Sequence, residues 1–244
     1  MIKSTLKKIP LLTKIFHFVK FLIQRNKIKK ILDLKNNEKK FIKIYKTNFW
    51  GDRESISGPG SNIKNTKETI HLLKKIIKKY NVKKILDAPC GDFIWMYKVL
   101  NKMPYLKYIG IDIVNDLIEY NNKQYGKPNI KFYKKDILNN LFPKCDLIIC
   151  RDFLIHLSNK DIKKFLKNLK SSNFKFLLIN GYEAKSKRII NKEIVTGDFR
   201  ELDIFKYPVN ISKKYLFKYE DHKFQNTKTN YKSYLYLFEK KNIF

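Results

Sequence analysis

The chain is poor in glycine, proline, cysteine and acidic residues, and these shortages exclude several classes of protein. Its 244 residues include 8 Gly, 7 Pro, 3 Cys and 22 Asp and Glu, against 53 Lys and Arg. The cysteines, Cys90, Cys145 and Cys150, lack C-x-x-C spacing, so we expect free thiols in a reducing compartment rather than a disulfide framework or a metal centre. Lys14 and Lys20 interrupt the most apolar segment, which argues against a membrane-spanning helix.

The scarcity of glycine matters most at the turn after the first predicted strand. An apolar run ends in Asp87, and the turn that follows holds one glycine, Gly91. A second apolar run ends in Asp112, 21 residues beyond Gly91, a spacing typical of a ribose-binding half-site. A pyrophosphate cradle requires G-x-G-x-x-G, and Asp92 inside this turn would repel it. The pattern therefore predicts a nucleoside cofactor without phosphate.

Alternating apolar runs and helical segments predict a doubly wound α/β fold with a mostly parallel sheet. The expected strands are Ile85–Asp87, Tyr108–Asp112, Ile130–Ile137, Cys145–Asp152, Phe174–Ile179, Tyr215–Tyr219 and Tyr231–Glu239. The last two have no helix between them, so we expect an antiparallel pair at the sheet edge. Thr66 is the predicted N-cap of a helix over Lys67–Tyr80, and lysine-rich residues 31–47 are interpreted as a linker.

This ordered series resembles the class I S-adenosylmethionine-dependent methyltransferases. Their first motif, an acid followed by G-x-G-x-G, corresponds here to Asp87, Pro89, Gly91 and Phe93, with two glycines replaced. The resemblance implies a seven-stranded sheet, S-adenosyl-L-methionine as cofactor, an acid for the ribose hydroxyls and another for the adenine amino group. The implied cofactor-binding residues are Ser57, Gly58, Gly60, Asp87, Pro89, Gly91, Asp92, Phe93, Asp112, Ile113, Asp136, Ile137 and Arg151. The loop Ser57–Ser61 would meet the methionine carboxylate, or be a simple turn.

Five segments narrow the resemblance to a bacterial and viral subgroup that is associated with surface-polysaccharide assembly. They are Trp50–Asp52, Ser57–Ser61, Asp87–Phe93, Arg151–Leu157 and Gly197–Asp203. The similarity covers residues 48–240 and implies methyl transfer to an oxygen of a sugar-type acceptor, either a small molecule or a lipid-linked glycan. It is an analogy at the level of the fold, and the acceptor remains open.

Polar residues after the fourth predicted strand are the catalytic candidates. A methyltransferase must hold the acceptor in line with the methyl group and usually removes a proton from it. His156 has the side chain suited to a general base near neutral pH, Asp152 would orient it or bind the acceptor, and Arg151 would hold an anionic group. The alternatives are a backbone-bonded loop histidine and a mutual Arg151–Asp152 ion pair. No histidine spacing predicts a metal site.

A loop after the fifth predicted strand supplies two candidate substrate-binding residues, Arg200 and Asp203. Arg200 would bind a phosphate or carboxylate of the acceptor. The alternative is a surface ion pair with Glu201 or Asp198.

The N-terminal residues form a separate basic region. Apolar residues recur at helical spacing between Leu11 and Ile23 with lysines interleaved, which predicts an amphipathic extension over residues 1–47 before a methyltransferase domain over 48–244. Residues 6–30 would lie on an anionic membrane surface or pack against protein. We expect a cytoplasmic protein, which on the first alternative is peripheral at the inner membrane face.

The net charge of +31 leaves rival functions open. It favours nucleic acid as a partner, although a Lys-, Ile- and Asn-rich composition from an AT-rich genome would give the same charge. The fourth predicted strand ends in Cys150-Arg151-Asp152-Phe153, without the N-P-P-Y, D-P-P-Y or Pro-Cys of base methyltransferases. An RNA or DNA methyltransferase and a non-catalytic cofactor-binding scaffold at the membrane are therefore the alternatives to a glycan enzyme. The sequence does not indicate an oligomeric state.

Overall fold

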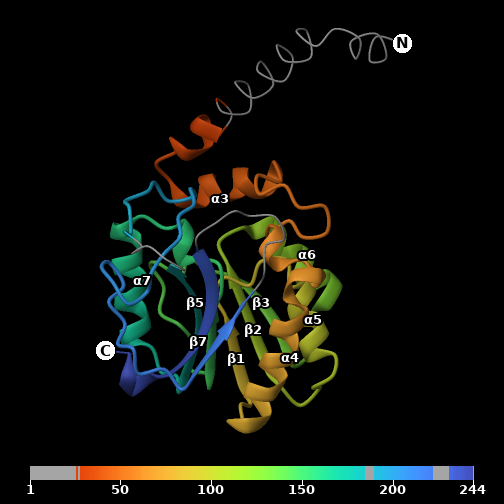
Figure 1. Cartoon of the computed structure of the whole chain (residues 1–244). Helices are drawn as coiled ribbons and strands as arrows, with labels where there is room; N and C mark the ends of the chain where they lie inside the picture. Colours follow the sequence, from red (N-terminus) through yellow and green to blue (C-terminus); the bar gives the residue numbers. More distant parts are fainter. Residues whose placement is uncertain (1–25, 27, 185–189, 222–230, 244) are drawn as a thin grey trace, which may run out of the picture.

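The computed structural model describes residues 26, 28–184, 190–221 and 231–243. Its centre is a seven-stranded sheet in the order β3-β2-β1-β4-β5-β7-β6 (Figure 1). The strands are β1 (Lys84–Asp87), β2 (Lys107–Asp112), β3 (Ile130–Lys134), β4 (Leu147–Cys150), β5 (Phe176–Ala184), β6 (Phe217–Glu220) and β7 (Tyr231–Glu239). β1 to β5 are parallel, and β7 pairs antiparallel with β5 and β6. The predicted fold class is therefore confirmed.

Both faces of the sheet are covered, which explains why its central strands are apolar throughout. All four residues of β4 are buried, as expected for a parallel strand between two helical layers. Helix α7 (Asn159–Ser171) packs on one face through Ile162, Phe165 and Leu169. The other face is covered by α4 (Ile63–Lys79), α5 (Ile94–Leu100) and α6 (Asn115–Tyr125). Short 3-10 turns occur at Pro59–Ser61, Leu154–His156 and Lys240–Asn242.

The helix expected over Lys67–Tyr80 begins earlier than predicted. α4 starts at Ile63, and its N-cap is Asn62, whose side chain accepts a hydrogen bond from the backbone N–H of Asn65. Thr66, the predicted cap, lies inside the helix and its hydroxyl donates to the carbonyl of Asn62 at 2.7 Å. Asn and Thr are both good caps, and the amphipathic pattern alone did not distinguish them.

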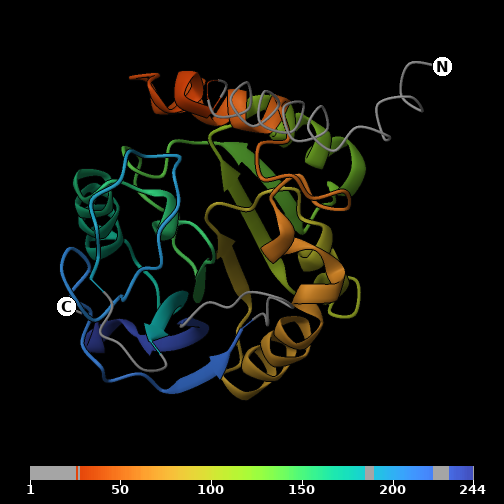
Figure 2. The ribbon, with the colours of Figure 1, turned by 45° about the horizontal axis from the view of Figure 1, so that its top comes forward.

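Helix α3 (Asn37–Lys46) occupies residues that we expected to be a linker. Figures 1 and 2 show it lying across the end of the sheet. Its buried residues Lys40 and Ile44 face Gly197, where an added Cβ would come within 2.9 Å of Lys40 Cδ. The linker interpretation is wrong here because the periodicity of Asn37, Phe41 and Tyr45, one residue every four, was hidden among lysines.

The amphipathic segment predicted over residues 6–30 lies outside the described residues, apart from 26 and 28–30. Within the part of the chain that is described, no helix has the length and apolar character needed to cross a membrane.

Candidate functional site

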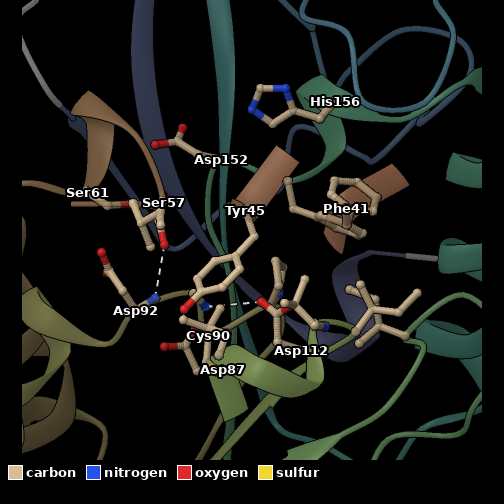
Figure 3. Close-up of a pocket in the computed structure, with 18 of the residues that line it drawn as sticks. Phe41, Tyr45, Ser57, Ser61, Asp87, Cys90, Asp92, Asp112, Asp152 and His156 are labelled. Carbon is tan, nitrogen blue, oxygen red and sulfur yellow. Dashed lines mark hydrogen bonds between the residues drawn. The ribbon is translucent and has the colours of Figure 1, made fainter. Parts of the chain in front are cut away.

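A deep pocket lies at the carboxyl ends of β1, β2 and β4 and beneath α3, where parallel α/β sheets place their ligands (Figure 3). It encloses about 1100 Å³, including the part open to solvent, which is ample for a nucleoside-sized ligand and a second molecule. Of the described residues, those that line it are Asn37, Phe41, Tyr45, Trp50, Ile56, Ser57, Ser61, Asp87, Pro89, Cys90, Gly91, Asp92, Trp95, Asp112, Ile113, Val114, Leu117, Asp136, Ile137, Leu138, Arg151, Asp152, Phe153 and His156.

The turn between β1 and α5 forms the floor of the pocket through its backbone. Gly91 has φ +53°, and a Cβ there would come within 2.3 Å of the Ser57 hydroxyl oxygen. That hydroxyl accepts a hydrogen bond from the Asp92 N–H at 2.9 Å, and the Asp92 carboxylate accepts one from the Ser55 hydroxyl at 2.7 Å. The turn and the Ser57 loop are therefore in direct contact, and only glycine fits where they meet.

Asp112 stands at the tip of β2 with its carboxylate aimed at the turn. It accepts hydrogen bonds from the N–H groups of Gly91 at 3.3 Å and Val114 at 3.1 Å. Burial outweighs these bonds and raises the pKa of Asp112 to about 6. The carboxylate is thus ionised at neutral pH and faces a pocket, as a group that accepts ribose hydroxyls should.

Asp87 is a second buried carboxylate in the same wall. The Tyr108 hydroxyl donates to it at 2.8 Å. Burial is the largest cause that raises the pKa of Asp87 to about 7, and the nearby Asp112 charge adds to it. The sequence did not predict Tyr108 as a partner of Asp87, because Tyr108 lies in the apolar run of β2, where an aromatic residue is expected to belong to the hydrophobic core.

These two raised pKa values predict an unusual pH dependence of stability. Because the native state binds protons more tightly than the unfolded chain, the free energy of unfolding of the ligand-free protein should rise as pH falls from 8 to 6, by on the order of 1–2 kcal/mol. Denaturant unfolding at several pH values measures this. Asp87→Asn should remove most of the rise, and an equal rise in that variant would contradict the assignment.

Asp136 and Ile137 follow β3 at the far end of the pocket. The Asp136 carboxylate accepts hydrogen bonds from the Leu138 N–H at 2.9 Å and from the Asn139 side chain at 2.6 Å. Ile113 and Leu138 line the wall beside them. A carboxylate among aliphatic side chains suits a flat base with an exocyclic amino group.

Helix α3 supplies a wall that was not predicted. One face of α3 lines the pocket with Asn37, Phe41 and Tyr45. The Tyr45 side chain lies at the end of the pocket near Asp112 (Figure 3). Polar contacts fix both ends of the helix: the Asn37 amide donates to Asp161 at 2.9 Å, and Lys46 pairs with Asp116 at 3.1 Å.

His156 lies on the opposite side of the pocket from the first turn (Figure 3). Its Nδ1 is 2.8 Å from the Asp198 carbonyl oxygen. Since a carbonyl can only accept, Nδ1 carries the hydrogen in the neutral ring, and Nε2 keeps its lone pair. The ring packs 5.1 Å from that of Trp50 and 6.0 Å from that of Phe199. Burial lowers the pKa of His156, which favours this neutral form.

Arg151 and Asp152 form the ion pair that was one of the two alternatives, and both also line the pocket. Arg151 Nη1 is 3.0 Å from Asp152 Oδ2, and its Nε donates to Asp221 at 2.9 Å. The role first considered for Arg151, holding an anionic group, is therefore disfavoured because two carboxylates already engage it. Asp221 was missed, since it stands after β6, far along the chain.

Three predicted cofactor-binding residues do not line the pocket. Phe93 is fully buried in an aromatic cluster, with rings of Tyr108 and Phe132 each at 4.9 Å. Gly58, with φ +98°, packs against Trp50, where a Cβ would meet Trp50 Cβ at 3.1 Å. Gly60 is likewise absent from the lining, although Ser57 and Ser61 belong to it. The motif fixes the course of the turn but not which of its residues face the pocket.

The two predicted substrate-binding residues also serve the loop rather than the pocket. Arg200 is buried, and its guanidinium donates to the Leu157 carbonyl at 2.7 Å, to Asn159 at 2.8 Å and to the Lys192 carbonyl. Neither the acceptor role nor the surface ion pair describes it. Asp203 caps its own turn by accepting from the Phe205 N–H at 3.0 Å and pairs with Lys206 at 2.9 Å.

Arg200→Met should therefore destabilise the fold without affecting the site. Losing charged hydrogen bonds and leaving buried carbonyls unpaired should cost about 2–4 kcal/mol of unfolding free energy. Cofactor affinity should stay within about threefold of wild type, measured by calorimetry at a temperature where the variant is folded. The exposed Arg53→Met is the matched control. A large loss of affinity with full stability would restore Arg200 to the site.

The charges around the pocket decide which ligand fits. Five lining residues are acids, Asp87, Asp92, Asp112, Asp136 and Asp152, and Arg151 is the one Lys or Arg among the lining residues described. A chain with a net charge of +31 thus surrounds an acidic pocket. Such a lining favours a cationic nucleoside and disfavours a pyrophosphate. Throughout the described residues, no cluster of three or more His, Cys, Asp or Glu is arranged for a metal ion.

Comparison with known proteins agrees with the geometry. Residues 85–172, about a third of the chain, match the family described as Methyltransferase domain. This segment contains the first turn, Asp112, Asp136 and His156, and stops before the loop that holds Asp198. No curated protein sequence matches the chain.

Solved structures share the fold at low identity. The N-methyltransferase NodS from Bradyrhizobium japonicum WM9, in complex with S-adenosyl-L-homocysteine, is 12% identical over 80% of this chain and 97% of that chain, with a TM-score of 0.58. Magnesium protoporphyrin IX methyltransferase from Synechocystis PCC 6803, with bound SAM, is 15% identical over 72% and 79%, with a TM-score of 0.48. The chain spans 44% of the length of the StiE O-MT structures that it matches. The likeness to NodS shows the class I methyltransferase fold.

Proposed function

We propose that this protein transfers the methyl group of S-adenosyl-L-methionine to a hydroxyl group of a sugar-type acceptor, with His156 as the general base. One observation carries the proposal: the pocket that Asp112 lines also contains an imidazole whose Nδ1 is held by a carbonyl. The domain match and the acidic lining support the cofactor.

The residues of this chain would hold the cofactor along its length. Asp112 would accept the two ribose hydroxyls, and Asp136 the adenine amino group, with Ile113 and Ile137 against the ring. The Gly91 backbone and the Ser57 loop would meet the methionine part. When bound, S-adenosyl-L-methionine supplies a methyl group already activated by a positively charged sulfur.

The chemical step then asks two things of the protein. It must align the acceptor hydroxyl with the methyl–sulfur bond, and it must accept the proton. S-adenosyl-L-methionine would supply the methyl group to the acceptor oxygen and leave as S-adenosyl-L-homocysteine, and Nε2 of His156 would accept the proton that the acceptor hydroxyl loses. The neutral tautomer fixed by the Asp198 carbonyl leaves that nitrogen ready to receive it.

The acceptor class is inferred from the walls around His156. The Trp50 ring lines the pocket next to the imidazole, tilted by 41° against it, and Asp152 lines the pocket as well. An aromatic ring near a carboxylate suits a molecule with an apolar C–H face and several hydroxyls. A sugar has both. The sequence resemblance to polysaccharide-associated methyltransferases supports the same choice.

The net charge of +31 favours one rival, an RNA methyltransferase. The acidic lining opposes it, since the phosphate backbone would have to approach five carboxylates. A methyl-transfer assay separates the two. Purified full-length protein receives labelled S-adenosyl-L-methionine with a polysaccharide and lipid-linked glycan extract in one reaction and total RNA in another. Label in the glycan fraction supports the proposal, and label in RNA overturns it. Cofactor binding without label in either fraction favours the scaffold.

A lipid-linked acceptor would also give the basic N-terminal region a purpose. We propose that residues 6–30 bring the domain to an anionic membrane surface, on the evidence of the sequence alone. Co-sedimentation with phosphatidylglycerol vesicles, with and without residues 1–30, tests this. Equal binding by both forms would contradict it.

A further inference from the structure

A buried polar network behind the pocket connects Asp152 to a residue that plays no part in the proposed chemistry. Asp221 is the residue that follows β6, and its side chain is fully buried. One of its carboxylate oxygens accepts from the Thr69 hydroxyl at 2.7 Å, and the other accepts from Arg151 Nε at 2.9 Å. This carboxylate joins α4 to the end of β4. Burying it costs free energy, so we expect its contacts to serve a function.

Arg151 connects Asp221 to Asp152, which lines the pocket. Its side chain is 4% exposed, its guanidinium carbon lies 5.8 Å from the centre of the Trp95 ring, and Nη1 pairs with Asp152 at 3.0 Å. Trp95 and Asp221 together fix the plane of the guanidinium. The fork geometry of arginine then determines where Asp152 lies.

Asp152 is held from its other side as well. The Asn180 amide donates to Asp152 Oδ1 at 2.7 Å, and the Asn180 side-chain oxygen accepts from the Asp152 N–H at 2.8 Å. This pair of bonds stabilises the left-handed backbone of Asp152, whose φ is +51°. The carboxylate is therefore aimed into the pocket in a single orientation.

The charges along this network do not cancel. Asp152 and Asp221 are acids and Arg151 is a base, so the three carry a net charge of −1. Without Asp221, the guanidinium would neutralise Asp152 instead. We propose that Asp221 is a positioning residue, which holds Arg151 against Asp152. Asp221 also balances the positive charge of Arg151, so that the negative charge of Asp152 continues to act on His156. The inference rests on the proposed role of His156.

The other groups around His156 stay constant when Asp221 is changed. Asp198 is the further charged residue that raises the pKa of His156, besides Asp152. Trp50 and Phe199 contribute neutral rings. Three residues of α3 line the pocket, Asn37, Phe41 and Tyr45. The buried Lys40 of the same helix lies near the charges of Asp161 and Asp33.

Asp221→Asn tests the proposal, with Glu220→Gln as a control that makes the same charge change at the neighbouring residue, which pairs with Lys232. The pKa of the His156 imidazole is measured by NMR titration of the full-length protein with S-adenosyl-L-homocysteine, and His156→Gln assigns the signal. Removing a negative charge should lower this pKa by about half a unit to one unit. The acidic limb of kcat/KM should move by the same amount, and kcat should fall about tenfold or more at unchanged cofactor Kd.

A double variant separates charge balance from structure. Arg151→Met with Asp221→Asn removes one positive and one negative charge, so the pKa of His156 should return close to the wild-type value. If Asp221→Asn does not fold, Asp221→Ser carries the same test. A pKa of His156 that stays within about 0.2 units of the Glu220→Gln control overturns the proposal. The shift is measured without turnover, so a shift together with full activity of His156→Ala would support the positioning role and overturn only the base.

Discussion

His156→Ala should lower kcat by about 100- to 1000-fold while the Kd of S-adenosyl-L-methionine changes by less than about threefold. General base catalysis contributes factors of this size, and His156 lies across the pocket from the carboxylates that would bind the cofactor (Figure 3). Steady-state methyl transfer and calorimetric titration measure the two quantities. The difference between them is the signature of a residue that acts on the acceptor proton.

The exposed His71 on α4 provides the matched control. His71→Ala should leave kcat and Kd unchanged. His156→Gln adds a further check, because glutamine can still hydrogen-bond but cannot take the proton, and it should be as inactive as alanine. Full activity of either His156 variant would remove the base from the proposed mechanism, and an amine or a more acidic hydroxyl would then become the better acceptor.

Asp112→Asn should weaken binding of S-adenosyl-L-methionine by about 30- to 100-fold. A carboxylate can accept both ribose hydroxyls, whereas an amide offers one oxygen, and charge-assisted hydrogen bonds are worth about 1.5–3 kcal/mol each. The same change should not destabilise the ligand-free protein at pH 8. There the ionised carboxylate is a cost, since burial has raised the pKa of Asp112 to about 6.

Asp116→Asn is the control, because Asp116 lies nearby in the first turn of α6 but is half exposed and pairs with Lys46 on the surface. It should change Kd by less than about twofold. Calorimetry gives the affinities, and denaturant unfolding gives the stabilities. If Asp112→Asn lost affinity and stability together, Asp112 would be a structural residue of the β2 tip rather than a ribose ligand.

The two effects of the buried carboxylates oppose each other. Because burial raises the pKa values of Asp87 and Asp112, these residues should make the ligand-free protein less stable at pH 8 than at pH 6, yet their ionised forms are the ones that would attract a cationic ligand. A pocket that is costly when empty and favourable when filled is the expected trade between stability and function.

Much of the fold could be predicted because apolar runs, each followed by an acidic residue, recur along the chain. Each of the first four strands is a short apolar run with an acid at its end or two residues beyond it, at Asp87, Asp112, Asp136 and Asp152. These acids also predicted which end of the pocket would hold the cofactor. Asp152 and His156 were predicted in the same way, since residues after a parallel strand meet at one edge of the sheet.

The errors have a common cause. Phe93 was predicted to bind the cofactor but is buried in the core, and Arg200 was predicted to bind the acceptor but donates to the carbonyls of Leu157 and Lys192. Sequence spacing tells which backbone approaches a ligand, whereas the direction of a side chain depends on what packs around it. Asp221 was missed for the same reason, because its partners Thr69 and Arg151 are 152 and 70 residues away.

The sequence by itself therefore determined the sheet, the candidate ribose-binding acid and the candidate base, because these follow from local periodicity and from the shared edge of parallel strands. Only the tertiary structure decided the rest. It brought Phe41 and Tyr45 of α3 over the pocket, turned the Asp198 carbonyl toward His156, and joined Asp221 to Arg151. These contacts connect residues distant in the chain, and they arise from packing and hydrogen bonding that no local pattern encodes.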